Sequence, residues 1–272
     1  MPMDSANIGG RTAYALSRLN CLPAFNNAAV KLLVQPFRDE DSIADIEDSF
    51  RSDPGLASDL LVAANSAAMG LRARVATLRH ALVVLGIDRI RSLVMTVATS
   101  SYMRQFPVEV VRPIWFHGIA TGVIAEQLAG YSDRLCGPAL YTAGLTHDLG
   151  RLGLLATERR RYASFLQEEY ENRDESELVE CDQFGVSHTV AGGLLTHLWG
   201  FPESLCAHAE NHHEESSFDT EEDRIVNTAC LLAHAMGYSE LRLRSTPELE
   251  GLERLDDQRR KQVEERVQSF LS

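Results

Sequence analysis

Cysteine is scarce in this chain, and its spacing is irregular. The five cysteines are Cys21, Cys136, Cys181, Cys206 and Cys230, and no two of them form a CxxC pair. An odd number of widely separated thiols argues against a disulfide framework and against a zinc site built from thiolates. We therefore expect reduced thiols that pack in the core or lie on the surface.

Long apolar runs are also missing. No segment approaches the ~20 consecutive apolar residues of a membrane-spanning helix. Residues 1–14 contain no apolar stretch of the kind found in secretory signals. The sequence therefore predicts a cytoplasmic protein with no membrane partner. With 272 residues, 44 % of them hydrophobic and 24 % charged, the composition is that of a globular protein with an ordinary core.

Positive charge is in deficit, because 26 Lys and Arg residues face 39 Asp and Glu residues, a net charge of −13. Such a chain repels phosphates unless a basic patch is segregated. The densest basic run, residues 159–161, follows Glu158 and precedes Glu168 and Glu169. This pattern is typical of a solvated helix face. We expect neither a nucleic-acid partner nor an anionic membrane surface.

Several familiar signatures are absent. The chain has no G-x-S-x-G motif, no Walker loop and no Rossmann fingerprint, which disfavours serine hydrolases, NTPases and dinucleotide enzymes. Alternating strands with Asn-Gly or Asp-Gly turns are also lacking. Apolar residues instead recur at three- and four-residue steps, as in Leu60, Leu61 and Ala64, or Leu93 and Val97. This periodicity predicts an all-α fold.

Proline, glycine and capping residues set the expected helix boundaries. Asp53-Pro54 predicts a helix start, with Gly70 closing that helix, and Gly86 separates the next two helices, the second running to about residue 102. Pro107 and Pro113 predict the boundary before a long helix over about 114–131. Later helices are expected to end near Gly150, to cover much of 156–182, and to span about 188–199, 202–213 and 224–237, with a polar loop over 214–223.

The C-terminal residues 239–272 are rich in charge but keep a possible apolar face. Its members are Leu249, Leu252, Leu255, Val263, Val267 and Phe270. We expect a helical extension that packs either on the body of the protein or on a partner chain. The pattern does not choose between these two arrangements.

Six of the nine histidines fall between residues 147 and 213. The candidate ligands, each on or at the end of an expected helix, are His117, His147, Asp148, His188, His212 and His213. Imidazole and carboxylate donors together suit zinc, iron, manganese or nickel, and facing helices can aim them inward. Neighbouring residues on a helix diverge by about 100°. The adjacent pairs 147–148 and 212–213 therefore best fit the edge of a cavity or a two-metal centre.

The alternative is a structural scaffold with no metal. A single histidine is more often a satisfied core or surface group than a ligand. Burying so many unpaired imidazoles and a carboxylate would, however, cost several kcal/mol. We interpret His80, His197 and His234 as structural or surface residues. His208, four residues before His212, shares its helix face and is a candidate extra ligand.

The segment GLTHDLGR, residues 144–151, resembles the His-Asp signature of the HD superfamily of metal-dependent phosphohydrolases. The chain as a whole resembles one branch of that superfamily, the HDOD (HD-related output) domain, over about residues 15–238. The segments that carry this resemblance, in family order, are DPGL at 53–56, ALVVLG at 81–86, WFH at 115–117, FGVSH at 184–188, WGFP at 199–202 and NHH at 211–213.

The resemblance implies an HDOD domain over residues 11–238. Its N-terminal helical subdomain (11–105) would pack on an HD-like helical subdomain (106–238). HDOD domains act as signalling or output modules of bacteria, so we expect a regulatory module with protein partners in a signalling pathway. The ligands of metal-dependent relatives match all six candidates above. We therefore expect one or two divalent transition metals (Fe, Zn, Mn or Ni).

The chain departs from the active relatives at three places. Their closing aspartate aligns with Cys230, which we interpret as a packed thiol, although a thiolate could bind a soft metal. The basic residue after the His-Asp pair is Arg151 instead of lysine. The GYP loop of cyclic-di-GMP phosphodiesterases is absent after His213, which disfavours that activity.

The competing hypothesis is an active metal-dependent phosphohydrolase. In that case Asp148 and Arg151 would be catalytic, with the arginine stabilising charge on the phosphoryl oxygens. A phosphate-containing small ligand and a homodimer that uses the C-terminal helix are further expectations.

Overall fold

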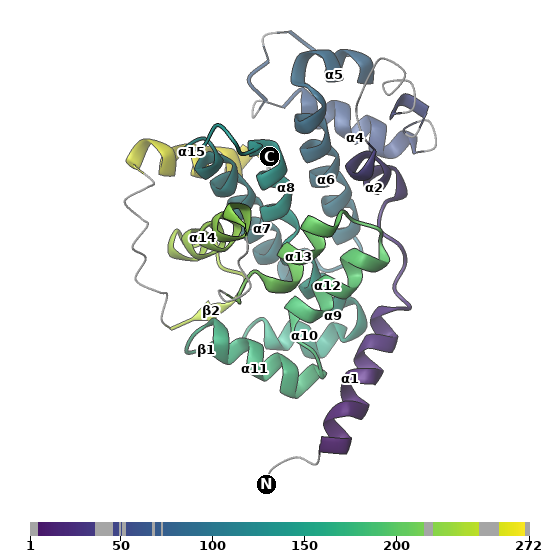
Figure 1. Cartoon of the computed structure of the whole chain (residues 1–272), viewed down its shortest axis with the longest axis vertical. Coiled ribbons are helices and arrows are strands. Elements are labelled where there is room, and N and C mark those ends of the chain that lie inside the picture. Colours follow the sequence, from purple (N-terminus) through teal and green to yellow (C-terminus); the bar gives the residue numbers. More distant parts are fainter. Residues whose placement is uncertain are drawn as a thin grey trace.

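The computed structural model describes residues 5–35, 46–48, 50, 53–66, 69–71, 73–214, 220–244 and 256–269. Helices dominate these residues, which confirms the predicted all-α class (Figure 1). A first group comprises α1 (Ser5–Leu19), α2 (Asn27–Val34), α4 (Pro54–Ala64), α5 (Leu78–Leu85) and α6 (Ile87–Met103). The helices that follow are α7 (Val108–Ala129), α8 (Gly137–Thr146), α9 (Leu149–Thr157), α10 (Arg159–Phe165) and α11 (Arg173–Phe184).

The remaining elements complete the body of the molecule. They are α12 (His188–Leu198), α13 (Glu203–Asn211), α14 (Glu221–Ala235), α15 (Asp257–Ser269) and two short strands, β1 (Glu169–Tyr170) and β2 (Arg242–Leu243). The strands pair in parallel, with Glu169 opposite Arg242 and Tyr170 opposite Leu243. The pairing divides the stretch 156–182, which was expected to be mostly helical, and brings the chain after α14 back toward α11.

Helices α2, α4 and α5 surround α6, which in turn packs on α8 (Figure 1). The predicted start of α4 is confirmed, because Asp53 Oδ1 accepts a hydrogen bond from the Leu56 N–H at 2.9 Å. Its predicted end at Gly70 is wrong. The chain leaves the helix at Asn65, whose side chain forms two 2.8 Å hydrogen bonds with the backbone of Val75.

Helix α7 is the central element and contacts α8, α14 and α15. It begins at Val108, directly after Pro107, so the start predicted near residue 114 is wrong. Pro113 lies in the second turn of the helix, where its missing N–H removes one helical hydrogen bond. Helix α8 approaches α7 closely. A Cβ at Gly122 would lie 2.8 Å from the carbonyl oxygen of Tyr141. Glycine therefore permits the contact that places the two helix backbones together.

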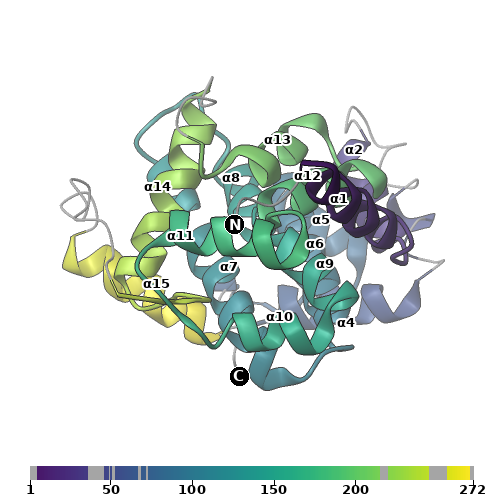
Figure 2. The same cartoon turned by 90° about the horizontal axis from the view of Figure 1, so that it is seen from below.

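Helix α1 lies away from the other N-terminal helices. It packs against α9, α11 and α12, and Figure 2 shows it beside α12. Residues 11–19 thus contact the half of the chain that was expected to form the HD-like subdomain. The division at residue 105 stays a prediction.

The C-terminal helix α15 packs on α7 of the same chain. Val263 and Val267 are fully buried, and Arg266 forms an ion pair with Glu126 of α7. Between the two arrangements left open above, the structure places this helix on the body. The other apolar positions of the predicted face lie outside the described residues: Leu249, Leu252, Leu255 and Phe270.

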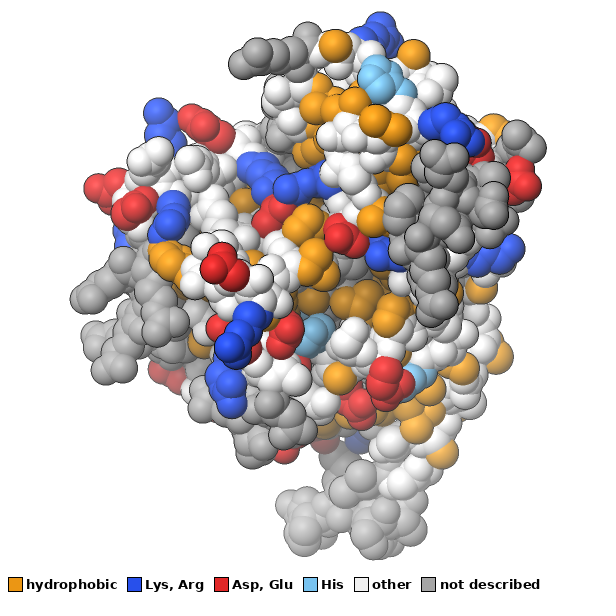
Figure 3. Space-filling view, turned by 45° about the horizontal axis from the view of Figure 1, so that its top comes forward, with side chains coloured by type: hydrophobic (Ala, Val, Ile, Leu, Met, Phe, Trp, Pro, Cys, Tyr) orange, Lys and Arg blue, Asp and Glu red, His pale blue; other side chains and the backbone are white. Residues whose placement is uncertain are grey.

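No helix within the described residues is long and apolar enough to cross a membrane. On the face drawn in Figure 3, acidic, basic and apolar side chains are intermixed, and the Lys and Arg side chains lie in separate places.

Candidate metal centre

Five of the six predicted ligands lie at the ends of helices or directly beyond them. Helix α8 ends at Thr146 and α9 begins at Leu149, so the helix end predicted near Gly150 is wrong. The break comes at His147 and Asp148, which occupy the two capping positions and can therefore face the same point. His212 follows the last residue of α13, and His188 is the first residue of α12.

The remaining members are His117, in the middle of α7, and His213. Five of the six side chains are at most 5 % exposed, and that of His213 is 10 % exposed. Residues that are far apart in the sequence thus form one buried polar cluster inside a helical body.

Asp148 lies between two sets of histidines. Its Oδ1 is 3.4 Å from Nε2 of both His188 and His212. Its Oδ2 is 3.8 Å from Nε2 of both His117 and His147, whose Nε2 atoms are 3.2 Å apart. We call His117, His147 and Asp148 half-site A. His188, His212 and His213, which Asp148 also faces, are half-site B; the potential ligand atoms in each trio lie within 4.8 Å of one another.

The outer ring nitrogens are held by the protein, which leaves the inner ones for a ligand. Nδ1 of His147 lies 2.6 Å from the Gly144 carbonyl oxygen, and Nδ1 of His117 lies 2.8 Å from that of Tyr238. An Nδ1–H that donates to such an oxygen leaves Nε2 with a free lone pair, the tautomer that binds metals.

Two potential metal-ligand atoms at the centre lack hydrogen-bond partners. They are Asp148 Oδ1 and His212 Nε2, and both are buried. Buried polar groups are normally satisfied. These two atoms lie 3.4 Å apart, among further imidazole nitrogens. The number, chemical type and spacing of these nitrogen and oxygen atoms fit a divalent transition metal.

Arg151 extends the cluster on one side. Its side chain is 1 % exposed, and its guanidinium contacts Asp148 at 3.1 Å, Glu180 at 3.0 Å and Glu240 at 3.1 Å. The single positive charge of the arginine is thus shared among three buried carboxylates and offsets only part of their charge. A catalytic role for Arg151 stays a prediction, and the enclosure of its guanidinium means that a phosphate would have to displace at least one carboxylate to reach it.

The charges in the cluster shift the pKa values of its members. Burial raises the pKa of Asp148, but Arg151 and His147 lower it by a larger amount, so the pKa lies well below its usual value. Burial also raises the pKa of Glu240, which the charges of His117 and His234 nevertheless bring to about 2. Burial and the neighbouring His213 hold the pKa of His212 well below its usual value. The carboxylates therefore remain ionised and His212 remains neutral. Burial lowers the pKa of His117, but Glu240 and Cys230 outweigh burial and raise it to about 10, so a metal that binds His117 would displace a proton.

Sequence reasoning missed several residues that support the centre. Glu180 lies in a charged stretch that cannot be told from a solvent-exposed helix in the sequence. Glu240 follows α14, where no motif marks it. Glu177 faces His213 Nδ1 at 3.4 Å. His234, expected as structural or surface, is buried, with its ring 4.6 Å from that of His117. Its spacing of four residues from Cys230 on α14 is the signal that could have found it.

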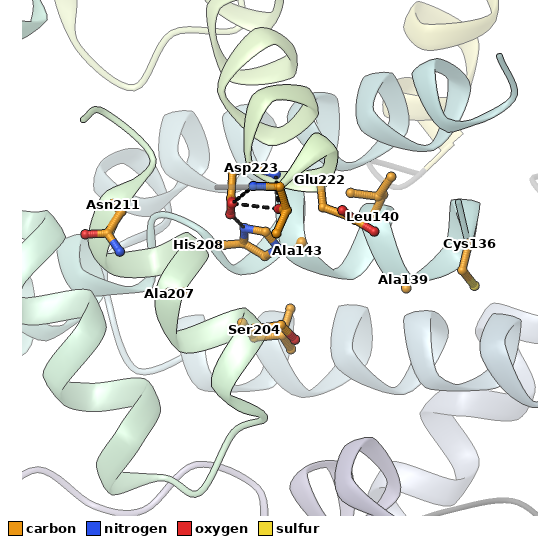
Figure 4. Close-up of a pocket in the computed structure, with 12 residues that line it drawn as sticks. Cys136, Ala139, Leu140, Ala143, Ser204, Ala207, His208, Asn211, Glu222 and Asp223 are labelled. Carbon is orange, nitrogen blue, oxygen red and sulfur yellow. Dashed lines mark hydrogen bonds and ion pairs between the residues drawn. The ribbon is translucent and has the colours of Figure 1, made fainter. Parts of the chain in front are cut away.

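The candidate extra ligand His208 faces away from the centre. Its Nδ1 lies 2.9 Å from Asp223 Oδ1, and Figure 4 shows the two side chains facing each other at the wall of a neighbouring cavity. This cavity has a volume of about 510 Å³, and its lining includes none of the six predicted ligands. His80 and His197 lie at the surface, as expected.

Comparisons with known proteins agree with the geometry. The sequence model of the HDOD domain matches residues 22–215. The chain belongs to the HDOD family. A curated relative, an uncharacterized protein of Treponema pallidum (strain Nichols), is 22 % identical over 187 residues, which are 68 % of this chain and 36 % of that protein. This HDOD chain thus spans about a third of the length of the curated relative.

Solved structures share the HDOD fold. An HDOD domain protein of unknown function from Geobacter sulfurreducens has a TM-score of 0.69 and 18 % identity, over 98 % of this chain and 90 % of the other. A Marinobacter aquaeolei VT8 protein, provisionally named as a signal transduction protein, has a TM-score of 0.70 and 20 % identity, over 98 % of this chain and 64 % of the other. A Shewanella amazonensis SB2B protein, provisionally named as a metal-dependent phosphohydrolase, has a TM-score of 0.66 and 16 % identity, over 97 % of this chain and 99 % of the other.

Proposed function

We propose that this chain is a regulatory HDOD module of a signal-transduction system, in which the His/Asp pocket holds one or two divalent transition metals as part of the folded structure. Family membership and the provisional name of the Marinobacter protein support the signalling role. The metal would be held by His117, His147, Asp148, His188, His212 and His213.

One observation carries the proposal. The six candidate ligands lie together and two of their atoms have no hydrogen-bond partner, yet five of the six are buried, and Arg151 beside them is enclosed by three carboxylates. A catalytic metal keeps an open position for water or substrate, whereas a structural metal is closed in by protein. A buried cluster in which three carboxylates outnumber the single arginine suits a metal cation that stabilises one conformation of a binding module.

The test is elemental mass spectrometry on protein purified without a metal-affinity tag, beside an Asp148→Ala, His212→Ala double variant. We expect one or two metals per chain in the parent protein and none in the variant, with circular dichroism confirming that both remain helical. Absence of metal from both proteins, even after incubation with zinc, iron, manganese and nickel salts, would overturn the metal pocket.

A second candidate function is metal-dependent phosphohydrolysis. The observation that favours it is the position of Asp148, whose two oxygens face the histidines of half-site A and half-site B separately. Paired metals bridged by a carboxylate can lower the pKa of a bound water and stabilise charge in phosphate ester cleavage. In this chain Asp148 would orient the pair, and Arg151 would have to exchange one carboxylate for a phosphoryl oxygen.

Turnover distinguishes the two candidates. The metal-loaded protein would be assayed against a broad panel of nucleotides, phosphomonoesters and phosphodiesters, with the double variant as the control. Hydrolysis that the double variant lacks would establish the enzyme. A metal-loaded protein that hydrolyses none of them supports the regulatory module. Protein partners, a phosphate-containing ligand and a homodimer all remain predictions.

A further inference from the structure

Cys230 occupies an unusual place for a thiol. It lies on α14, is 1 % exposed, and its Sγ is 3.5 Å from Nε2 of His117, a member of half-site A. The half-buried guanidinium of Arg173 approaches the same sulfur at 3.6 Å. The thiol thus faces both the interior of the candidate metal centre and a cation.

The distances match those between two ligands of one metal ion. Zinc bonds of ~2.0 Å to nitrogen and ~2.3 Å to sulfur, at a tetrahedral angle, place the two donor atoms about 3.5 Å apart. Two nitrogen ligands of the same ion are about 3.3 Å apart by the same geometry. The observed separations are 3.5 Å for Cys230 Sγ and His117 Nε2 and 3.2 Å for His117 Nε2 and His147 Nε2.

A second observation at the same place points to a ligand. His234, one turn after Cys230 on α14, has a 1 % exposed side chain, and its Nε2 forms no hydrogen bond, with Glu240 Oε2 lying 3.8 Å away. His234, Cys230 and His117 each offer a donor atom within 4.8 Å of the others. The buried thiol is therefore one of several donors gathered at this point.

We propose that Cys230 is a thiolate ligand of the metal in half-site A, which makes this a site for a borderline-soft cation such as zinc. The donor set would then comprise nitrogen from His117 and His147, oxygen from Asp148 and sulfur from Cys230. Thiolate and imidazole favour zinc, whereas oxygen-rich sets favour manganese and magnesium. This inference rests on the metal pocket proposed above and adds to it the chemical type of the metal.

Cobalt substitution tests the sulfur ligand directly. Co²⁺ replaces Zn²⁺ at tetrahedral sites and gives an intense sulfur-to-cobalt charge-transfer absorption in the near ultraviolet only when a thiolate is bound. All proteins in the experiment would carry Ser at the exposed positions Cys21, Cys136 and Cys181, because those thiols could bind cobalt adventitiously. The parent protein is expected to show both the charge-transfer band and the visible bands of tetrahedral cobalt.

The matched variants are Cys230→Ser and Cys206→Ser. Both replace a buried thiol, but Cys206 Sγ contacts the carbonyl oxygen of Phe201 at 3.6 Å and belongs to no candidate ligand group. Cys230→Ser should abolish the charge-transfer band and lower zinc affinity by more than the ~10–100-fold that loss of a supporting contact costs. Cys206→Ser should keep both. Cys230→Asp should move the preference from zinc toward manganese.

The outcomes separate this inference from the pocket on which it rests. Visible cobalt bands without a charge-transfer band in the parent protein would leave the His/Asp pocket intact and overturn the thiolate ligand. An unchanged charge-transfer band in Cys230→Ser would overturn it as well. Failure of the parent protein to bind cobalt or zinc at all would overturn the pocket, and the thiolate ligand with it.

Discussion

A single oxygen of Glu180 holds both the backbone and the ring of His188. Oε2 accepts a hydrogen bond from the His188 N–H at 2.8 Å and lies 2.6 Å from its Nδ1. The other oxygen lies 3.0 Å from Arg151 and 2.5 Å from the Tyr162 hydroxyl. Glu180 thus fixes the tautomer and direction of a candidate ligand in half-site B without itself facing the metal.

The first prediction concerns this support. Glu180→Gln should lower metal affinity by roughly 10–100-fold, the usual cost of losing a carboxylate behind a metal-binding histidine. Competition with a chelator of known affinity measures the change. Glu177→Gln is the comparison, because Glu177 contacts the more exposed His213 at a longer distance of 3.4 Å and should change the affinity less. Equal affinity in Glu180→Gln and the parent protein would contradict the assigned role.

The second prediction concerns Arg151. Replacing it with Met leaves Asp148, Glu180 and Glu240 without their shared cation, and breaking a buried ion pair from one side costs about 3–5 kcal/mol. Urea unfolding of the metal-free protein should therefore show a loss of stability of this order, and Arg151→Lys a smaller loss. Unchanged stability in Arg151→Met would mean that the arginine is available for another task, such as phosphate binding.

The third prediction concerns the contact between α9 and α12. A Cβ at Gly150 would lie 1.9 Å from the carbonyl oxygen of His188 and 2.5 Å from the amide nitrogen of Gly192. Gly150→Ala should therefore push α12 away, lower stability by at least the ~1–3 kcal/mol of ordinary overpacking, and reduce the metal content. Thermal unfolding and elemental analysis measure both effects.

The control for that substitution is Gly10→Ala. Gly10 lies within α1, and a Cβ there would meet no atom within 4 Å. Alanine in a helix is favoured over glycine by roughly 0.5–1 kcal/mol, so this variant should be slightly stabilised, with the metal content unchanged. Similar losses in both variants would show that the contact between α9 and α12 is not the cause.

The fourth prediction concerns α15. A chain that ends at Ser245 lacks Val263 and Val267, each of which buries its side chain and contributes about 1.5–3 kcal/mol. We expect a lower unfolding midpoint in urea, with the other helices retained. Sedimentation of both chains tests the predicted homodimer: a dimer that persists after truncation would reject the C-terminal helix as its contact.

The sequence identified the candidate ligands that the structure brings together, but it did not identify the residues that orient them. The candidate ligands stand in short motifs, and the adjacency of His147 and Asp148 could be interpreted from helix geometry alone. Glu180 and Glu240 could not be found in this way, because a carboxylate that will be buried against Arg151 looks the same in sequence as one exposed to solvent. Only the pairing of β1 with β2 and the fold of α11 bring them inward.

Helix starts were predicted well where a side chain caps the backbone, as at Asp53. The errors occurred where tertiary contacts outweigh local signals. Pro113 is tolerated in α7, where much of that helix is buried. Gly150 does not end a helix, because it lies in the first turn of α9 at the close contact with α12.

The short parallel pairing of β1 with β2 has a consequence for the order in which the protein is made. Glu240, Tyr238 and Cys230 all emerge from the ribosome after the last of the six predicted ligands, and Glu240 is held near the centre by a strand only two residues long. A nascent chain that has reached His213 already carries every predicted histidine and aspartate ligand, but His117 and Arg151 still lack their final partners. Completion of the candidate metal centre is therefore a late event in synthesis, and a chain truncated before residue 240 would be synthesised with the six predicted ligands present and the site unfinished.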